Sequence, residues 1–203
     1  MQREEKSERS RRQVLDTALQ LFSQQGYRAT SVRDIADRAG VSTGNLYHHF
    51  PDKETIFNAL LDEFWAETET ARFPFRRVLM STEFPDNIEQ LGFAARDSVH
   101  EYRPYVALIY VDVIEFEGTH IRRFYGDITR RLGDILEQVG ARERVVKRLR
   151  PGVDPVSALM LVTRTFFDYF TIQILFRVPE PFGKDSAQII KEIADIVRNG
   201  VVA

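Results

Sequence analysis

Apolar residues recur at intervals of three and four along almost the whole chain, and runs of strict alternation between apolar and polar residues are short. Intervals of three and four mark one face of an α-helix, whereas strands alternate with a period of two. The sequence therefore predicts an all-α fold. At 203 residues the chain is long enough to bury a sizeable core, as one domain or as two small ones.

Cysteine is absent from the chain, and histidine occurs only four times. Disulfides, thiolate zinc sites and a cysteine nucleophile are therefore excluded, and little material is left for a metal cluster. His48 and His49 are neighbours, so on a helix they point about 100° apart and do not share a metal ion. A Ser-His-acid set, a glycine-rich phosphate loop and a pair of carboxylates at catalytic spacing are also missing. We expect no cofactor, no metal and no enzymatic activity.

The first residues, MQREEKSERSRRQ, contain no apolar stretch of the kind that a secretory signal needs. No run of apolar residues reaches the ~18 that span a bilayer. We therefore expect a cytoplasmic protein that does not enter the membrane.

Four helices are expected in the N-terminal third. Residues 10–25 form the first, and residues 52–72 form the fourth, which connects to the rest of the chain. Between them, Ser31 and Ser42 are suited to cap two short helices. A short helix, a tight turn and a second short helix over residues 31–50 predict a helix-turn-helix motif.

The apolar residues of this motif face inwards and the polar residues face outwards, as DNA binding requires. Val41 and Leu46 fill the space between the two helices, which leaves these residues facing outwards: Thr43, Gly44, Asn45, Tyr47 and His48. Hydroxyl and amide groups reach base edges or phosphate oxygens, and glycine permits close approach of the backbone. Residues 1–53 carry nine Lys and Arg against seven Asp and Glu, and the remainder carries 19 against 23, a modest positive excess at this end. A helical hairpin in an ordinary core is the alternative.

The N-terminal segment resembles the TetR family of repressors over roughly residues 8–68. The resemblance includes the segment YHHF and the lysine that follows it, and it is carried by Gly26, Tyr27, Thr30, Ser31, Ile35, Ala36, Ala39, Gly40, Val41, Ser42, Gly44, Leu46, Tyr47, His49, Phe50, Lys53 and Glu54. It implies a three-helix DNA-binding domain over residues 8–68, with its motif at 31–50. A bridging helix would join this domain to a ligand-binding and dimerisation domain over residues 69–203, which carries no motif that we can match.

The same resemblance implies a role for each exposed residue of the motif. A helix from Ser42 would enter the major groove, with Thr43 and Asn45 at base edges and Tyr47 and His48 at phosphates. Thr30 and Ser31 would approach the DNA backbone, and Lys53 would add a phosphate contact where the dipole of the bridging helix favours an anion. The residues expected to contact DNA are thus Thr30, Ser31, Ser42, Thr43, Gly44, Asn45, Tyr47, His48 and Lys53. Three arginines before the motif either screen the duplex or form a solvated charge run: Arg9, Arg11 and Arg12.

The C-terminal two thirds is expected to contain further amphipathic helices at residues 88–102, 104–116, 120–139, 155–176 and 186–199. The helix at 155–176 is apolar on nearly all sides, so it needs cover from several directions. A homodimer in which the last two helices of each subunit pack together would supply that cover, as the resemblance also implies. A central core helix within one subunit is the alternative.

Aromatic and aliphatic residues of this region are candidates to line a ligand pocket: Trp65, Tyr105, Ile109, Tyr110, Phe116, Phe124 and Phe166. Ordinary core packing is the alternative for each. Charged residues near apolar helix faces either orient a ligand or form structural salt bridges, which we prefer: Asp112, Glu115, Arg164 and Asp168.

These features predict a sequence-specific repressor that a small, lipophilic molecule releases from a palindromic operator. The ligand would favour a dimer with wrongly spaced recognition helices, through the bridging helix, and so lower operator affinity. One alternative is a DNA-binding protein whose helical body docks a protein partner. A small helical enzyme is the other.

Overall fold

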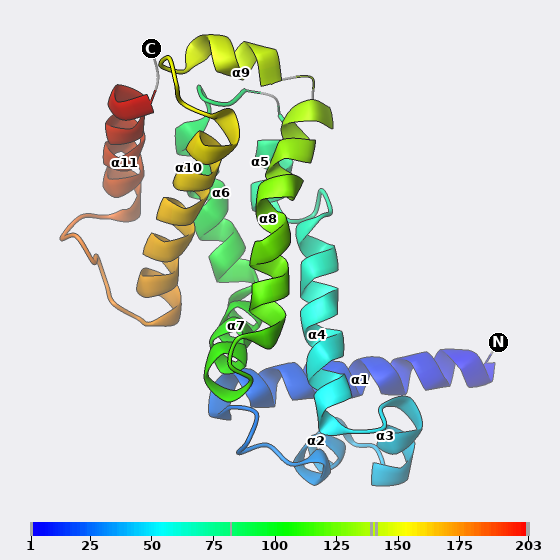
Figure 1. Ribbon diagram of the computed structural model, residues 1–203. Helices are drawn as coiled ribbons and strands as arrows, with labels where there is room; N and C mark the ends of the chain where they lie inside the picture. Colours follow the sequence, from blue (N-terminus) through cyan, green and yellow to red (C-terminus); the bar gives the residue numbers. More distant parts are fainter. Residues whose placement is uncertain (1, 82, 139, 141, 202–203) are drawn as a thin grey trace. The chain divides into compact units, whose positions relative to one another are not determined.

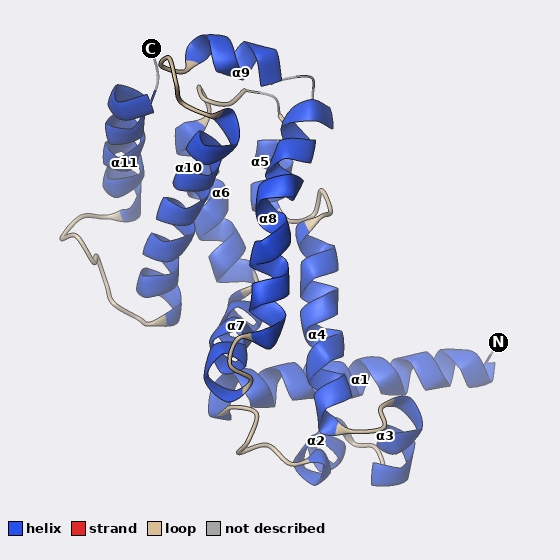
Figure 2. Ribbon diagram, in the orientation of Figure 1, coloured by secondary structure: helices blue, strands red, loops and turns tan. Residues whose placement is uncertain are grey.

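The structure is a computed structural model that describes residues 2–81, 83–138, 140 and 142–201. Within these residues every regular element is a helix, which confirms the all-α prediction (Figures 1 and 2). In chain order the helices are α1 (Gln2–Gln25), α2 (Val32–Ala39), α3 (Thr43–His49), α4 (Lys53–Thr68), α5 (Pro74–Leu79), α6 (Ile88–Glu101), α7 (Arg103–Glu115), α8 (Thr119–Gln138), α9 (Arg142–Arg148), α10 (Pro155–Phe170), a π-helical turn (Thr171–Leu175) and α11 (Ser186–Val201).

The helices differ from the sequence prediction in some of their boundaries and in their number. α1 begins near the N-terminus of the chain, well before residue 10, and α4 ends at Thr68. Two short helices, α5 and α9, were not expected, because six or seven residues are too few to show a clear period. Val139, at the end of the helix expected over 120–139, lies outside the described residues.

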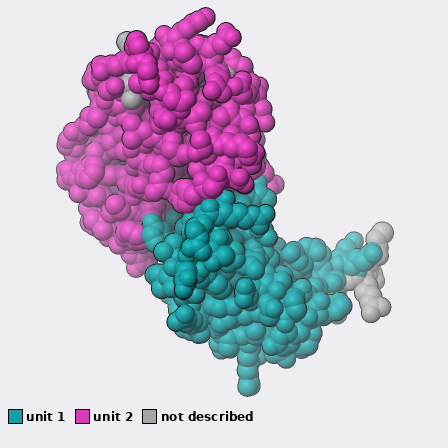
Figure 3. All heavy atoms as spheres, viewed as in Figure 1, with its two compact units in different colours: residues 1–66, 104–123 teal, residues 67–103, 124–203 magenta. Residues whose placement is uncertain are grey.

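The chain folds into two compact units (Figure 3). Unit 1 consists of Met1–Ala66 and Pro104–Arg123, and unit 2 of Glu67–Arg103 and Phe124–Ala203. This division differs from the contiguous one expected from the sequence, because α7 and the start of α8 belong with the N-terminal helices. Each unit is described on its own.

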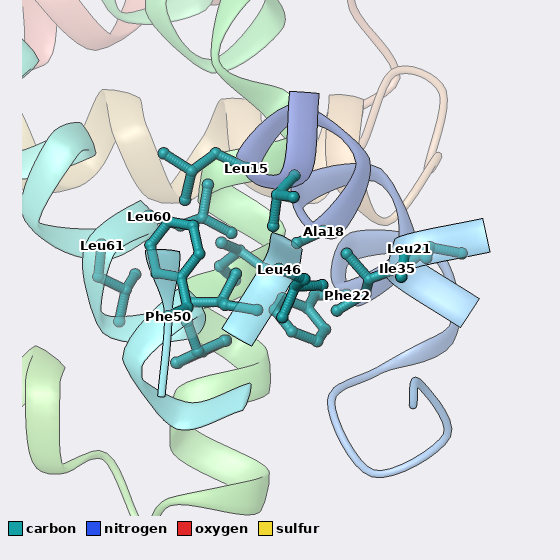
Figure 4. Packing of buried hydrophobic residues seen from close by; sticks show 14 residues of the cluster. Leu15, Ala18, Leu21, Phe22, Ile35, Leu46, Phe50, Leu60 and Leu61 are labelled. Atoms are coloured by element: carbon teal, nitrogen blue, oxygen red, sulfur yellow. The ribbon is translucent and has the colours of Figure 1, made fainter. Parts of the chain in front are cut away.

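Unit 1 is built around a buried cluster that α1, α2, α3, α4 and α7 all enter. Figure 4 shows how the side chains from the first four of these helices converge, with Phe22, Ile35 and Leu46 completely buried. The ring of Phe57 on α4 packs edge-on against Phe22 and stacks on Phe116, with centroids 5.7 and 4.8 Å apart. The helix-turn-helix is therefore held on a core to which residues far along the chain contribute.

Unit 2 is centred on the packing of α10 against α6. Gly92 on α6 lies so close to α10 and α11 that a β-carbon there would come within 2.9 Å of the Phe166 ring and 2.8 Å of Ile190. By length and composition alone, Pro155–Leu175 is apolar enough to cross a membrane. Its residues Val162, Phe166 and Phe170 are completely buried in unit 2, which is the behaviour of a core helix. The expected alternative of a central core helix is thus correct for one side of α10.

Candidate nucleic-acid interface

The first helix of the motif, α2, begins with a reciprocal cap. Ser31 Oγ accepts a hydrogen bond from the Asp34 N–H at 3.1 Å, and the Ser31 N–H donates to Asp34 Oδ2 at 2.9 Å. The Ser31 hydroxyl also donates to Asp34 Oδ2 at 2.6 Å, and this bond, followed by the one from the Ser31 N–H, holds the pKa of Asp34 below its usual range. Gly40 ends the helix with a φ of +69°, a left-handed conformation that glycine adopts at little cost. The tight turn expected within the motif is therefore present at residues 39–41.

The second helix, α3, buries Leu46, half-buries His49 and exposes its other residues. Ser42 caps the helix, because its Oγ accepts a hydrogen bond from the Asn45 N–H at 3.1 Å. Leu46 is completely buried, which fixes the rotation of the helix. The polar residues expected to face DNA are all exposed: Ser42, Thr43, Gly44, Asn45, Tyr47 and His48. The Asn45 side chain is not used by the cap, so it is available for an outside partner.

Thr30 does not belong to this surface, and its assignment as a DNA contact was wrong. The residue is completely buried. Its hydroxyl donates to the Gly26 carbonyl at 2.8 Å and accepts from Gln25 Nε2 at 3.2 Å. The side chain is thus used inside the loop between α1 and α2, whereas the adjacent Ser31 is exposed.

Lys53 is fixed by the same loop. Its Nζ donates to the carbonyls of Tyr27 at 2.8 Å and Thr30 at 2.7 Å. Partial burial lowers the pKa of Lys53, and the negative charge of Glu115 acts in the opposite direction. The ammonium therefore joins the start of α4 to the loop that precedes α2. A phosphate contact by Lys53 stays a prediction.

The arginines near the motif fall into two groups. Arg12 forms ion pairs with Asp16 and Glu63, which raise its pKa, so it is tied to α1 and α4. Arg28 and Arg33 have more exposed side chains, at 82% and 84%, although each also forms an ion pair at 3.7 Å, with Glu115 and Asp37 respectively. Sequence reasoning did not single out these two residues. Their positive charge beside the motif was the available signal, and exposure makes them further candidates for phosphate contacts.

His49 is half-buried behind the exposed face of α3. Its Nε2 is buried and has no hydrogen-bond partner among the described residues. Burial lowers the pKa of His49, and the neighbouring charges of His48 and Arg11 act in the same direction. This environment gives the ring a packing role inside the domain.

The residues expected to line a ligand pocket are divided between the units. Five belong to unit 1 and two, Phe124 and Phe166, belong to unit 2. Tyr105 stacks on Phe64 with centroids 5.3 Å apart, and Phe116 stacks on Phe57. These contacts place Tyr105 and Phe116 in core packing, and Phe166 is completely buried. Ligand binding by the seven residues stays a prediction.

Unit 2 contains a surface groove of about 720 Å³ that includes none of these residues. It is lined by Pro74, Arg77, Arg96, Asp97, His100, Glu101, Gln173 and Ile174. Both positive and negative side chains line it, so its charge does not select for one kind of ligand.

The charged residues near apolar faces form structural pairs, as we preferred. Buried Asp112 lies 2.5 Å from Nδ1 of His120 and accepts a hydrogen bond from the Ile121 N–H at 2.9 Å. His120 is therefore a partner in a partly buried pair. Arg164 and Asp168 form an ion pair at 3.1 Å on the surface, not in the interior.

A capped helix-turn-helix with an exposed polar recognition face, on a chain whose regular elements are helical, defines the class of helix-turn-helix DNA-binding proteins. The family described as "Bacterial regulatory proteins, tetR family" matches residues 14–60. The N-terminal segment is therefore a tetR-family domain, and the recognition made from the sequence is confirmed.

Named relatives and solved structures agree with this family. The repressor KstR2 of Mycobacterium tuberculosis is 38% identical over 103 residues, which is 50% of each chain. KstR2 of Rhodococcus jostii is 52% identical over 54 residues, 27% of this chain and 26% of the relative. The chain thus matches half or less of the length of these curated relatives.

Structural likeness extends over nearly the whole chain. The solved structure of the ketosteroid transcriptional regulator KstR2 of Mycobacterium tuberculosis has a TM-score of 0.57 and 25% identity, covering 95% of both chains. NalD of Pseudomonas aeruginosa, a repressor of a multidrug efflux pump, has a TM-score of 0.63 at 24% identity, covering 97% of this chain and 98% of its own. The chain as a whole therefore has the fold of tetR-family regulators, which are not enzymes.

Proposed function

We propose that the chain is a cytoplasmic, sequence-specific transcriptional repressor that binds operator DNA through α3. The carrying observation is the geometry of α3, in which buried Leu46 fixes the helix and presents Thr43 and Asn45 to solvent. An amide side chain such as that of Asn45 can pair with both N6 and N7 of adenine in the major groove. Tyr47 and His48 would hold the register by contacting phosphates.

A homodimer supplies the second recognition helix that such a short element needs. Three aliphatic residues, on α10, the π-helical turn and α11, are exposed in the single chain: Leu161 at 49%, Ile172 at 39% and Ile196 at 65%. Burial of such residues against a partner removes apolar surface from water and stabilises the pair. We infer that residues 155–176 and 186–199 form the dimer interface, and that the operator is palindromic with half-sites about 34 to 36 Å apart.

The proposed effector is a small lipophilic molecule that weakens operator binding. The matched KstR2 structure is described as that of a ketosteroid regulator, and steroids are lipophilic. The effector would favour a dimer conformation whose recognition helices do not fit the operator, so that the two ligands oppose each other by linkage. The bridging helix α4 is the proposed lever, because its residues belong to unit 1 up to Ala66 and to unit 2 beyond it.

Selection from a pool of random duplexes tests the DNA-binding claim directly. The full chain should enrich one palindromic sequence and bind it at least 1,000-fold more tightly than random DNA at the same salt concentration. Equal affinity for all duplexes would exclude a sequence-specific regulator.

A panel of ketosteroids and other lipophilic molecules, added to saturation, tests whether the effector releases the protein from the selected sequence. An unchanged affinity for the selected sequence throughout would defeat the effector claim alone.

A further inference from the structure

The loop between α1 and α2 is held from two sides by charged side chains. Glu115, the last residue of α7, accepts hydrogen bonds from the N–H groups of Tyr27 at 2.9 Å and Arg28 at 2.8 Å, one at each carboxylate oxygen. The Nζ of Lys53 donates to the carbonyls of Tyr27 and Thr30. A side chain of α7 thus binds the N–H groups of the loop backbone, and a side chain of α4 binds its carbonyl groups.

The fit at Glu115 is close. Gly26 has a φ of +89°, and a β-carbon at this position would lie 2.9 Å from Glu115 Oε1. The carboxylate is largely buried, with 14% of its side chain exposed. Hydrogen bonds from backbone amides to an ionised carboxylate are roughly twice as strong as those between neutral groups. The carboxylate therefore determines the path of the backbone through this loop.

The end of α7 that carries Glu115 is itself fixed. One turn earlier, buried Asp112 accepts a hydrogen bond from the Ile121 N–H and pairs with His120 at the start of α8. Phe116 stacks on Phe57 of α4 with centroids 4.8 Å apart. Glu115 thus projects from a rigid point and not from a loose helix end.

The loop leads directly into the DNA-facing surface. Arg28 lies within it and is exposed, and Ser31 follows as the exposed cap of α2. A displacement of the Tyr27 and Arg28 amides would carry Arg28 and the N-terminus of α2 with it. Phosphate contacts at both positions depend on that placement, since such contacts fix the register of a protein on the duplex.

We propose that Glu115 is a positioning residue for operator binding, which sets the α1–α2 loop in the conformation that DNA requires. This inference rests on the proposed function. It assigns a part in DNA binding to a carboxylate far outside the helix-turn-helix motif, where a negative charge alone would be expected to repel the duplex.

Replacing Glu115 with Gln tests the proposal in the full chain. The amide keeps one acceptor oxygen but turns an N–H toward the second loop amide. We expect hydrogen exchange at the Tyr27 and Arg28 amides to quicken by about 10-fold or more, as follows from losing a charge-assisted hydrogen bond. Affinity for the selected operator should fall by about 10-fold, and the slope of log affinity against log salt should become shallower by about one, because a phosphate contact is lost.

Glu117→Gln is the matched control, since it removes the same charge from an exposed side chain two residues away. It should leave both the amide exchange and the salt slope unchanged. Glu115→Asp retains the charge but withdraws the carboxylate, and it should shift the same readouts in the same direction. This second variant keeps the test decisive if Glu115→Gln does not fold.

Two results would overturn the proposal. Faster exchange at the two amides with wild-type operator affinity and salt slope would show that the hydrogen bonds to Glu115 do not position the DNA-binding surface. Unchanged exchange in both variants would show that the carboxylate does not hold the loop. Failure of the unaltered chain to bind any duplex would instead reject the proposed function itself.

Discussion

The Nζ of Lys53 lies 4.0 Å from the centre of the Tyr27 ring while it donates a 2.8 Å hydrogen bond to the carbonyl of the same residue. One side chain thus engages both the ring and the backbone of Tyr27. Attraction between a cation and an aromatic face adds to the hydrogen bond, more so when the pair is partly removed from water. The start of α4 and the entry to the helix-turn-helix are therefore a single structural joint.

Replacement of Lys53 by Met should weaken this joint. Methionine keeps most of the aliphatic stem but removes the ammonium that donates to the Tyr27 and Thr30 carbonyls, while the Tyr27 carbonyl keeps its hydrogen bond from the Thr30 N–H at 3.2 Å. We expect the free energy of unfolding to fall by about 1–3 kcal/mol. Urea denaturation followed by circular dichroism measures the change. Lys147→Met, at an exposed position on α9, should have almost no effect. Equal stability of the Lys53 variant and the wild type would mean that the joint contributes nothing.

Asn45 and Tyr47 should affect DNA binding in different ways. Asn45→Ala should weaken binding to the selected operator by about 1–3 kcal/mol and relax the preference for one base pair, because a base-edge contact is lost. Tyr47→Phe should weaken binding to all duplexes alike, because it removes a phosphate contact. Fluorescence anisotropy at one fixed salt concentration, with the operator and its single-base variants, separates the two patterns. A uniform loss for Asn45→Ala would reassign that residue to the DNA backbone.

Two glycines on helices of unit 2 should respond to alanine with opposite signs. At Gly92 the new methyl group would meet Phe166 and Ile190 at less than 3.0 Å, so overpacking should lower the free energy of unfolding by about 1–3 kcal/mol. At Gly126 on α8 no heavy atom lies within 4 Å of the added carbon. The higher helix propensity of alanine should therefore raise the free energy of unfolding by up to about 1 kcal/mol. Thermal and urea denaturation of both variants test the pair, and a stable Gly92→Ala variant would contradict the close packing of α6 on α10.

The proposed dimer should come apart when charge is placed on α10. Leu161→Glu would bury an unpaired carboxylate in the interface, so we expect monomers in sedimentation velocity and a loss of operator affinity of at least 100-fold. Val146→Glu is the control, because this α9 residue is similarly exposed, at 51% against 49% for Leu161. Dimers that persist in the Leu161 variant would place the interface elsewhere.

The pair formed by Glu67 and Tyr102 should make stability depend on pH at both extremes. Hydrogen bonds from Arg72 above all, and then from Tyr102, hold the pKa of Glu67 below its usual range. Burial and the bond to Glu67 raise the pKa of Tyr102 to about 12. Stability from the depressed carboxyl is present above its unfolded pKa of about 4.3 and is lost as the pH falls through the lower folded value.

Stability from the raised phenol is present below pH ~10 and is lost as the pH rises towards 12. Tyr102→Phe cannot ionise, so the difference in unfolding free energy between the wild type and this variant should change between pH 10 and 12. Urea titrations across that range provide the measurement. A difference that stays constant with pH would mean that the phenol ionises equally easily in the folded and unfolded chains.

Sequence periodicity was sufficient to predict the long helices and the orientation of α3, because buried Leu46 and its polar neighbours follow the helical repeat. It was not sufficient for contacts that depend on tertiary structure. Thr30 has the hydroxyl of a phosphate ligand, yet the fold uses that hydroxyl inside the α1–α2 loop. Asp112 and His120 are eight residues apart on different helices, and only the turn between α7 and α8 brings them together.

Residues from α7 complete the core of unit 1, and this affects how such chains can be recombined. Leu108 is completely buried in the same cluster as the helix-turn-helix residues, and Phe116 stacks on Phe57. A hybrid protein that joined residues 1–68 to the C-terminal region of a relative would lack both side chains unless that region supplied equivalent ones. The exchangeable part of this protein is therefore discontinuous in the gene, so α7 would have to be transferred together with the N-terminal helices.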